Sequence, residues 1–150
     1  RMVTSSLEGT GMDPSYLKLE ITESALMENA HLSAQMLQDL KALKIRVCVD
    51  DFGTGYSSLS YLHTFPIDTL KIDKSFVQDM GRNRHNLEIV RTISLLAQNL
   101  RLDVIAEGVE TPEQLAQLRA IGCGFAQGYL FSEPLNVAGV ERLLRENRSW

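Results

Sequence analysis

The sequence predicts an α/β fold built on a parallel sheet, and two observations support this fold class. Short apolar segments alternate with amphipathic segments of helical periodicity along the 150 residues. Such alternation is typical of a parallel sheet, either open and doubly wound or closed into a (β/α) barrel. A closed TIM-type barrel has eight strands and usually about 250 residues. Because we expect five strands here, we predict an incomplete TIM-type (β/α) barrel, about five βα units of a modified (β/α)8 barrel.

The expected strands are Tyr16–Ile21, Ile45–Val49, Thr69–Ile72, Asp103–Ala106 and Phe125–Phe131. The expected helices are Ala30–Leu43, Ser57–Leu62, Leu87–Leu100, Pro112–Ile121 and Val137–Glu146. Thr111 before Pro112 is a typical helix start, with a capping hydroxyl followed by proline at the first helical position. Residues 1–13 are expected to be the end of a helix and a loop. We expect residues 1–150 to be the carboxy-terminal portion of a single domain.

Composition excludes several classes of protein. The net charge of −4 disfavours a protein that binds a nucleic-acid polymer, which carries a basic surface. No apolar run approaches the roughly 18 residues that cross a bilayer, so we expect no membrane contact from this segment. Cys48 and Cys123 lack metal-ligand or redox spacing and are expected to be reduced thiols. A cytoplasmic location is therefore expected, although a larger parent protein could be membrane-anchored.

Polar side chains end each expected strand on one face of the sheet. Side chains alternate across a strand, so residues two positions apart share a face. Applying this parity to each strand places on one side Glu20, Asp50, Lys71, Glu107 and Gln127. The carboxyl ends of parallel strands carry the functional sites of α/β folds, because the βα loops meet there. A single acid at a strand end is usually a surface charge or a helix cap, but this joint pattern indicates a site.

Carboxylates gathered at one rim require a compensating charge. Two unit charges about 4 Å apart repel by about 4 kcal/mol at an effective dielectric constant of 20. The acids therefore bind either protons or cations. An all-oxygen set of ligands favours Mg²⁺, Mn²⁺ or Ca²⁺ over zinc or copper. Asp50 at the strand end and Asp51 in the next position could serve two adjacent ions. His31, His63 and His85 show no ligand spacing.

Five segments resemble the signature blocks of the EAL family, in the order of that family. They are LEITES (Leu19–Ser24), VDDFGTGYSSLSYL (Val49–Leu62), LKID (Leu70–Asp73), AEGVET (Ala106–Thr111) and QGYLFS (Gln127–Ser132). The resemblance covers the chain from about Leu17 to Leu135. It implies a bacterial phosphodiesterase of second-messenger signalling that hydrolyses cyclic di-GMP to linear pGpG in a TIM-type barrel, with two Mg²⁺ or Mn²⁺ ions.

The resemblance also implies roles for individual residues. The metal ligands would be Glu20, Asp50, Asp51 and Glu107, with Asp50 bridging two ions. Lys71 would be the catalytic residue that orients or deprotonates the attacking water, since a lysine pKa can fall in a crowded site. Such ions would bind a phosphate oxygen and lower the pKa of the water.

Further residues would support the site or contact the nucleotide. The resemblance implies that Glu23 steadies the loop after Asp51, and that Glu110 supports the site. Phe52, Gly53, Thr54 and Gly55 lie in the Phe52–Ser58 loop, which in this family couples metal and substrate binding to dimerisation. Gln127 and Asp73 are expected to contact the substrate, and a homodimer or other self-association is expected.

Some features expected of the family do not appear in this sequence. The Glu-Ala-Leu tripeptide and an asparagine ligand, both on early strands, would precede Arg1. We therefore expect the chain alone to be inactive and its parent to be active. Glu133 stands before Pro134 where relatives often carry a basic residue. An alternative interpretation is a non-catalytic domain that binds cyclic di-GMP or a partner protein.

A phospho-accepting receiver domain is the third interpretation. That class also has an Asp pair and a strand-end lysine in a parallel sheet. Its lysine usually precedes proline, whereas Lys71 precedes Ile72, and the glycine-rich run after Asp51 does not fit it. The receiver interpretation is therefore disfavoured.

Overall fold

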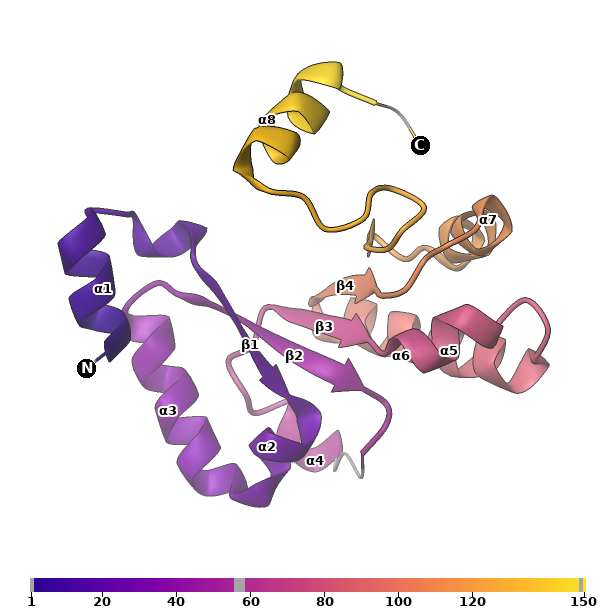
Figure 1. Ribbon diagram of the computed structural model, residues 1–150. Coiled ribbons are helices and arrows are strands. Elements are labelled where there is room, and N and C mark those ends of the chain that lie inside the picture. Colours follow the sequence, from indigo (N-terminus) through magenta and orange to yellow (C-terminus); the bar gives the residue numbers. More distant parts are fainter. Residues whose placement is uncertain (1, 56–58, 149) are drawn as a thin grey trace.

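A five-stranded parallel sheet organises the molecule (Figure 1). The structure is a computed structural model, and it describes residues 2–55, 59–148 and 150. The strands are β1 (Lys18–Thr22), β2 (Arg46–Phe52), β3 (Thr69–Ile72), β4 (Asp103–Ala106) and β5 (Phe125–Ala126). They lie in chain order and every neighbouring pair is parallel. The predicted α/β class with a parallel sheet is therefore confirmed.

One helix precedes the first strand, and the others follow the strands in turn. They are α1 (Met2–Thr10), α2 (Glu23–Glu28), α3 (Ala30–Ala42), α4 (Leu59–Leu62), α5 (Lys74–Asp79), α6 (Arg84–Leu100), α7 (Pro112–Ile121) and α8 (Val137–Glu146), with a 3₁₀ turn at Pro14–Tyr16. Helix α3 packs on β2, and α6 packs on β3 and β4. Among the described residues, no helix combines the length and the apolar character needed to cross a bilayer.

The core lies around β2 and β3. All four residues of β3 are buried, including the polar Thr69 and Lys71, and Val47 and Val49 of β2 are buried beside them. Such continuous burial is expected for a strand that is covered on both faces. Burying a leucine or valine side chain stabilises the fold by about 1.5–3 kcal/mol, so this region supplies a rigid base for the strand ends.

The sheet is open at both edges. Strand β1 pairs only with β2 and β5 only with β4 within the described part of the chain, so the sheet does not close on itself. Helix α8 stands apart from the sheet at the top of Figure 1 and has no buried residue. This arrangement is that of an incomplete (β/α) barrel, as predicted.

The boundaries of β3, β4, α7 and α8 match the predictions, whereas other elements differ. The prediction of a strand from Phe125 to Phe131 is wrong beyond Ala126. The backbone N–H groups of Phe131 and Ser132 donate to the carbonyl of Gly128, so the chain turns there. Tyr16 lies in the 3₁₀ turn rather than in β1, because Asp13 caps that turn. Helices α2 and α5 were not predicted. Of the helix expected at Ser57–Leu62, Ser57 and Ser58 lie outside the described residues.

Candidate functional site

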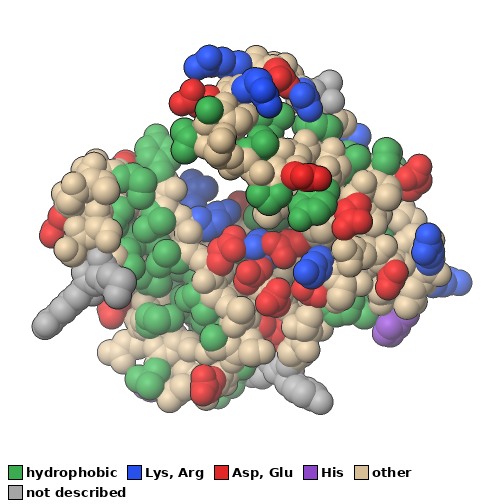
Figure 2. Space-filling view, in the orientation of Figure 1, with side chains coloured by type: hydrophobic (Ala, Val, Ile, Leu, Met, Phe, Trp, Pro, Cys, Tyr) green, Lys and Arg blue, Asp and Glu red, His purple; other side chains and the backbone are tan. Residues whose placement is uncertain are grey.

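The ammonium of Lys71 joins acids from three other segments. Its Nζ lies 2.9 Å from Glu20 Oε2 and 3.0 Å from Asp50 Oδ1, and it also forms an ion pair with Glu107. These residues occupy β1, β2, β3 and the position after β4, all at the carboxyl ends of the strands. Figure 2 shows acidic side chains gathered near the middle of the face that carries these ends. The structure therefore brings together four of the five residues that strand parity selected.

A bulge in β2 brings Asp51 to the same rim. The register between β2 and β3 shifts between Val49 and Phe52, and Asp51 has a φ of 53° in the left-handed region. Such a bulge inserts one residue and redirects the side chains beside it. As a result, carboxylate oxygens of Asp50, Asp51 and Glu107 lie within 4.8 Å of one another. Glu20 contacts Lys71 but is not part of this group of three.

The surroundings of Lys71 set its protonation. Burial by itself lowers the pKa of this ammonium, but its hydrogen bonds to Glu107, Glu20 and Asp50 outweigh burial and raise the pKa above its usual range. The groups around the ammonium are carboxylates, which stabilise its charged form. A fall in the pKa of Lys71 stays a prediction for the site with two cations bound, because those cations would offset the carboxylate charge.

The pKa of Asp51 is raised, as expected for an acid that is close to other acids. Partial burial raises its pKa, and the negative charges of Asp50 and Asp73 raise it further. Three close carboxylates with one raised pKa fit a divalent cation, because a cation relieves the same repulsion that a proton relieves. The donor set consists of oxygen alone, which suits Mg²⁺, Mn²⁺ or Ca²⁺. The residues present therefore fit the metal that the sequence predicted.

Glu23 fixes the backbone that follows Asp51. It is buried at the start of α2, and its Oε2 accepts a hydrogen bond of 2.7 Å from the backbone N–H of Gly53. Gly53 has a φ of 101°, and a Cβ there would lie 3.0 Å from side chains of Phe76 and Ile93. This position therefore requires glycine.

The other predicted loop residues occupy different environments. Phe52 is buried in the hydrophobic core rather than at the rim. Thr54 donates from its hydroxyl to the carbonyl of Asp51 at 2.8 Å. Gly55 lies against the carboxylate of Glu23. The predicted loop extends to Ser58, but Tyr56–Ser58 lies outside the described residues.

Asp73 and Glu110 both form hydrogen bonds with α5. Asp73 caps α5, where its Oδ1 accepts from the backbone N–H of Ser75 at 3.0 Å. The side chain of Glu110 accepts from Gln78 Nε2 at 3.0 Å. The geometry thus gives Asp73 a capping contact and Glu110 a contact with α5.

A hollow of about 350 Å³ opens beside Glu107. Its lining includes Lys74, Glu110, Gln127 and Tyr129. Gln127 was the fifth residue selected by strand parity, and it borders the acidic site through this hollow rather than through contact with Lys71. The hollow thus presents an amine, an amide, a carboxylate and an exposed aromatic ring next to the acids.

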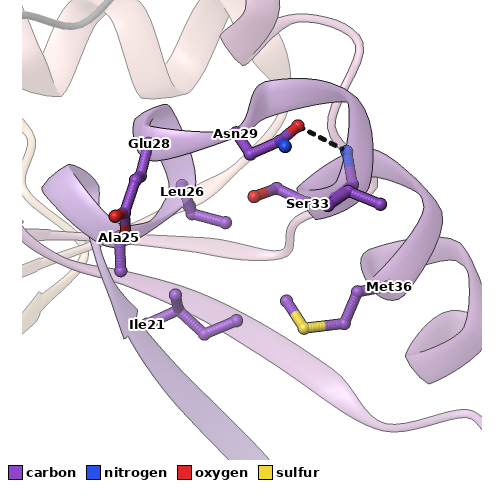
Figure 3. A pocket seen from close by; sticks show the side chains of 8 residues that line it. Ile21, Ala25, Leu26, Glu28, Asn29, Ser33 and Met36 are labelled. Carbon is purple, nitrogen blue, oxygen red and sulfur yellow. Dashed lines mark hydrogen bonds between the residues drawn. The ribbon is translucent and has the colours of Figure 1, made fainter.

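A larger hollow of about 760 Å³ is separate from these acids. It lies between β1, α2 and α3, and Figure 3 shows Ile21, Leu26 and Met36 around it. Ile21 points away from the face that carries Glu20, as strand alternation requires. The lining is mostly apolar and contains only Glu28 as an ionisable side chain. This hollow therefore lacks the chemistry of the strand-end site.

Sequence reasoning missed two glutamines that connect to the site. Gln78 at the end of α5 and Gln114 near the start of α7 both bond to the loop that follows Glu107. The pattern Thr111-Pro112-Glu113-Gln114 is a capping-box signal that could have identified Gln114. No local signal identifies Gln78, because its partner is 32 residues away.

Comparison with known proteins identifies the family. The family model described as EAL domain matches residues 2–134. Cyclic di-GMP phosphodiesterase NbdA of Pseudomonas aeruginosa is 48% identical over 146 residues, which are 97% of this chain and 19% of that protein. The chain thus spans about a fifth of the length of that curated relative.

Solved structures agree with this result. The PaMucR phosphodiesterase in complex with c-di-GMP superposes with a TM-score of 0.90 at 39% identity, over 92% of this chain and 56% of the other. The manganese and cyclic di-GMP complex of BlrP1 from Klebsiella pneumoniae superposes with a TM-score of 0.82 at 33% identity, over 89% of this chain and 34% of the other. The five-stranded sheet, its strand-end acids and these matches show that the chain belongs to the EAL domain family.

Proposed function

We propose that this chain contributes catalytic residues to the hydrolysis of cyclic di-GMP to linear pGpG. The observation that carries the proposal is the meeting of Lys71 with Glu20, Asp50 and Glu107 at one rim, with Asp51 beside them. The names of similar proteins, a cyclic di-GMP phosphodiesterase and a phosphodiesterase in complex with c-di-GMP, support the choice of substrate.

The cofactor in this proposal is Mg²⁺ or Mn²⁺. Asp50, Asp51 and Glu107 would hold it, since their oxygens are close enough to share an ion. Glu20 contacts Lys71 and would join the set in a two-ion site. Such ions bind phosphate oxygens, lower the pKa of a coordinated water and offset the charge that develops as the ester breaks.

Lys71 would act on the reacting groups directly. Its ammonium lies among three carboxylates and is almost fully buried, so it is held at one point in the site. From there it would donate a hydrogen bond to the attacking water or to a phosphate oxygen. A fixed donor of this kind stabilises charge without the cost of reorganising solvent.

The nucleotide would extend into the hollow of about 350 Å³ beside Glu107. Gln127 offers both a donor and an acceptor there, and Glu110 offers an acceptor for the edge of a base. Asp73 lies beside Asp51 and would face the same substrate. Glu23 would support catalysis indirectly, by fixing Gly53 and the backbone after Asp51.

We further propose that residues 1–150 act as the carboxy-terminal portion of a single EAL domain. The open edges at β1 and β5 support this proposal, because a TIM-type barrel closes with eight strands. Additional strands would complete both the barrel and its metal site. Open edges also favour pairing with another chain, so we propose a homodimer or other self-association when those strands are absent.

The test is product formation by the longest protein that carries these 150 residues. Cyclic di-GMP is incubated with that protein and Mg²⁺ or Mn²⁺, and pGpG is quantified by chromatography. We expect pGpG from the wild-type protein and at least a 100-fold lower rate for Lys71→Met. Tight binding of cyclic di-GMP without any pGpG would instead support the non-catalytic binding domain. Failure of both binding and turnover would contradict the proposal.

A further inference from the structure

A ring of hydrogen bonds joins α5 to the loop after β4. Gln114 Oε1 accepts from the backbone N–H of Glu110 at 2.7 Å and from that of Thr111 at 2.9 Å. Gln114 Nε2 donates to the backbone carbonyl of Gln78 at 3.2 Å. Gln78 Nε2 donates in turn to the carboxylate of Glu110 at 3.0 Å. The ring therefore links the end of α5, the 107–110 loop and the start of α7.

Gln114 is the buried member of this ring. Its residue surface is only 8% exposed, and its amide uses both acceptor positions and one donor. Loss of these partners would lower the stability of the fold, because water does not replace them around a buried amide. The position of Gln114 is therefore tightly determined, and so are the backbone groups that it binds.

The 107–110 loop is also held from its other side. The backbone N–H of Val109 donates to the carbonyl of Gln127 at 3.0 Å, and the N–H of Glu107 donates to the carbonyl of Ile72 at 3.1 Å. Gly108, with a φ of 69°, lies so close to α5 that a Cβ there would be 2.7 Å from Lys74 Cβ. The loop that carries Glu107 is thus held between α5, the end of β3 and the residue that follows β5.

We propose that Gln114 is a positioning residue that holds the 107–110 loop against α5 and thereby fixes the carboxylate of Glu107 beside Lys71 and Asp50. The hydrogen bonds of the Gln114 side chain go to backbone groups and not to these three side chains, so its action passes through the backbone of the loop. Removing its Nε2 donor would release the end of α5 from α7. Glu107 would then sample positions away from the acids that it joins.

A simpler interpretation gives Gln114 only the role of a helix cap. It sits at the third position of α7 in a capping box with Thr111. Glutamate serves equally well in that motif, because its carboxylate accepts the same backbone N–H bonds. Gln114→Glu therefore preserves the cap but places an acceptor against the carbonyl of Gln78. The two interpretations predict opposite results for this variant.

Hydrogen exchange on the 150-residue chain, measured without any ligand, distinguishes the positioning role of Gln114 from a role as a helix cap alone. We expect Gln114→Glu to unfold at a lower denaturant concentration than the wild type, because its buried carboxylate faces the carbonyl of Gln78, and we expect the amides of residues 107–110 to lose at least 10-fold more protection than the amides of β3. Ala116→Glu adds the same charge to an exposed position of α7 and should leave these amides unchanged. Equal protection in Gln114→Glu and wild type would overturn the proposal.

Manganese affinity tests the consequence for the site, and this part rests on the proposed function. Substitution of groups that support metal ligands typically weakens binding 10- to 100-fold. We expect about a 10-fold weaker Mn²⁺ affinity for Gln114→Glu, by titration followed with electron paramagnetic resonance, and no change for Ala116→Glu. The titration uses the longest protein that carries these 150 residues. If that wild-type protein binds no Mn²⁺, the metal site is contradicted, and hydrogen exchange still decides the role of Gln114. Unchanged affinity in Gln114→Glu would overturn the proposal.

Discussion

The carboxylate of Glu23 accepts a hydrogen bond of 2.7 Å from the backbone N–H of Gly53, 30 residues further along the chain. This contact ties the start of α2 to the loop that follows the two aspartates of β2. Glu23 is buried, so its carboxylate is shielded from water. The bond therefore fixes the backbone at Gly53 next to the acidic rim, and its strength can be measured.

Glu23→Ala should destabilise the chain by about 1.5–3 kcal/mol, the usual contribution of a hydrogen bond to a charged group. Glu23→Gln keeps an acceptor for the backbone N–H of Gly53, so its free energy of unfolding should fall by less than that of Glu23→Ala. Urea unfolding followed by circular dichroism measures both changes. Equal stability of Glu23→Ala and wild type would show that the contact contributes nothing to the fold.

Lys71→Met should destabilise the chain by about 3 kcal/mol, because it leaves carboxylates from β1 and β2 and Glu107 without their shared cation. Lys41→Met is the matched control. Its ammonium pairs with Asp68, but the side chain is 47% exposed, so its loss should cost under about 1 kcal/mol. The same unfolding experiment compares the two variants, and similar losses from both would contradict the central role of Lys71.

Cys48 should make stability fall in alkaline solution. Burial raises the pKa of its thiol to about 12, and the charge of Glu20 adds to the effect. Above about pH 8.5 the unfolded chain loses this proton while the folded chain keeps it, so the folded state binds more protons. The free energy of unfolding therefore falls as pH rises, by up to about 1.4 kcal/mol per pH unit. Below that pH the thiol is neutral in both states.

The measurement is urea unfolding at several pH values between 8 and 10, on wild type and Cys48→Ala. The wild type should show the steeper loss, since alanine has no proton to release. Cys123 is present in both proteins and cancels from the comparison. Parallel pH profiles would mean that burial of the Cys48 thiol does not resist ionisation.

The open edge at β5 should promote self-association of the isolated chain. Phe125 in this strand is 55% exposed, so an apolar ring lies at the unpaired edge. Phe125→Lys should reduce association, because edge lysines oppose strand pairing. Sedimentation velocity at increasing concentration measures both proteins. A wild type that stays monomeric throughout would contradict this expectation.

Much of the fold could be predicted from the sequence because the elements carry strong local signals. The start of α7 is set by Thr111 and Pro112, and its end by Gly122, so its bounds were predicted correctly. The error at β5 arose because apolar residues after Gly128 continue the strand pattern. Their backbone partners are instead Val109 and Gly128, and those contacts depend on tertiary structure.

Part of the candidate site could also be predicted from local sequence signals. Strand parity placed Glu20, Asp50, Lys71 and Glu107 on one face, and the structure brings them into contact. Parity cannot place Asp51, because its position depends on a bulge that shifts the register of β2. Gln78 was missed because its partners belong to a distant loop. The metal and catalytic roles of the rim residues remain predictions.

Binding of Mn²⁺ to the longest protein that carries these 150 residues tests the central claim most directly. Titration followed by electron paramagnetic resonance should show a bound ion in the wild type and at least 10-fold weaker binding in Asp51→Asn, whose carboxylate lies with those of Asp50 and Glu107. Asp103→Asn, at the opposite end of β4 and exposed, should bind like the wild type. If the wild type binds no Mn²⁺, or if both variants bind it equally, the acids at the strand ends are not a divalent-cation site.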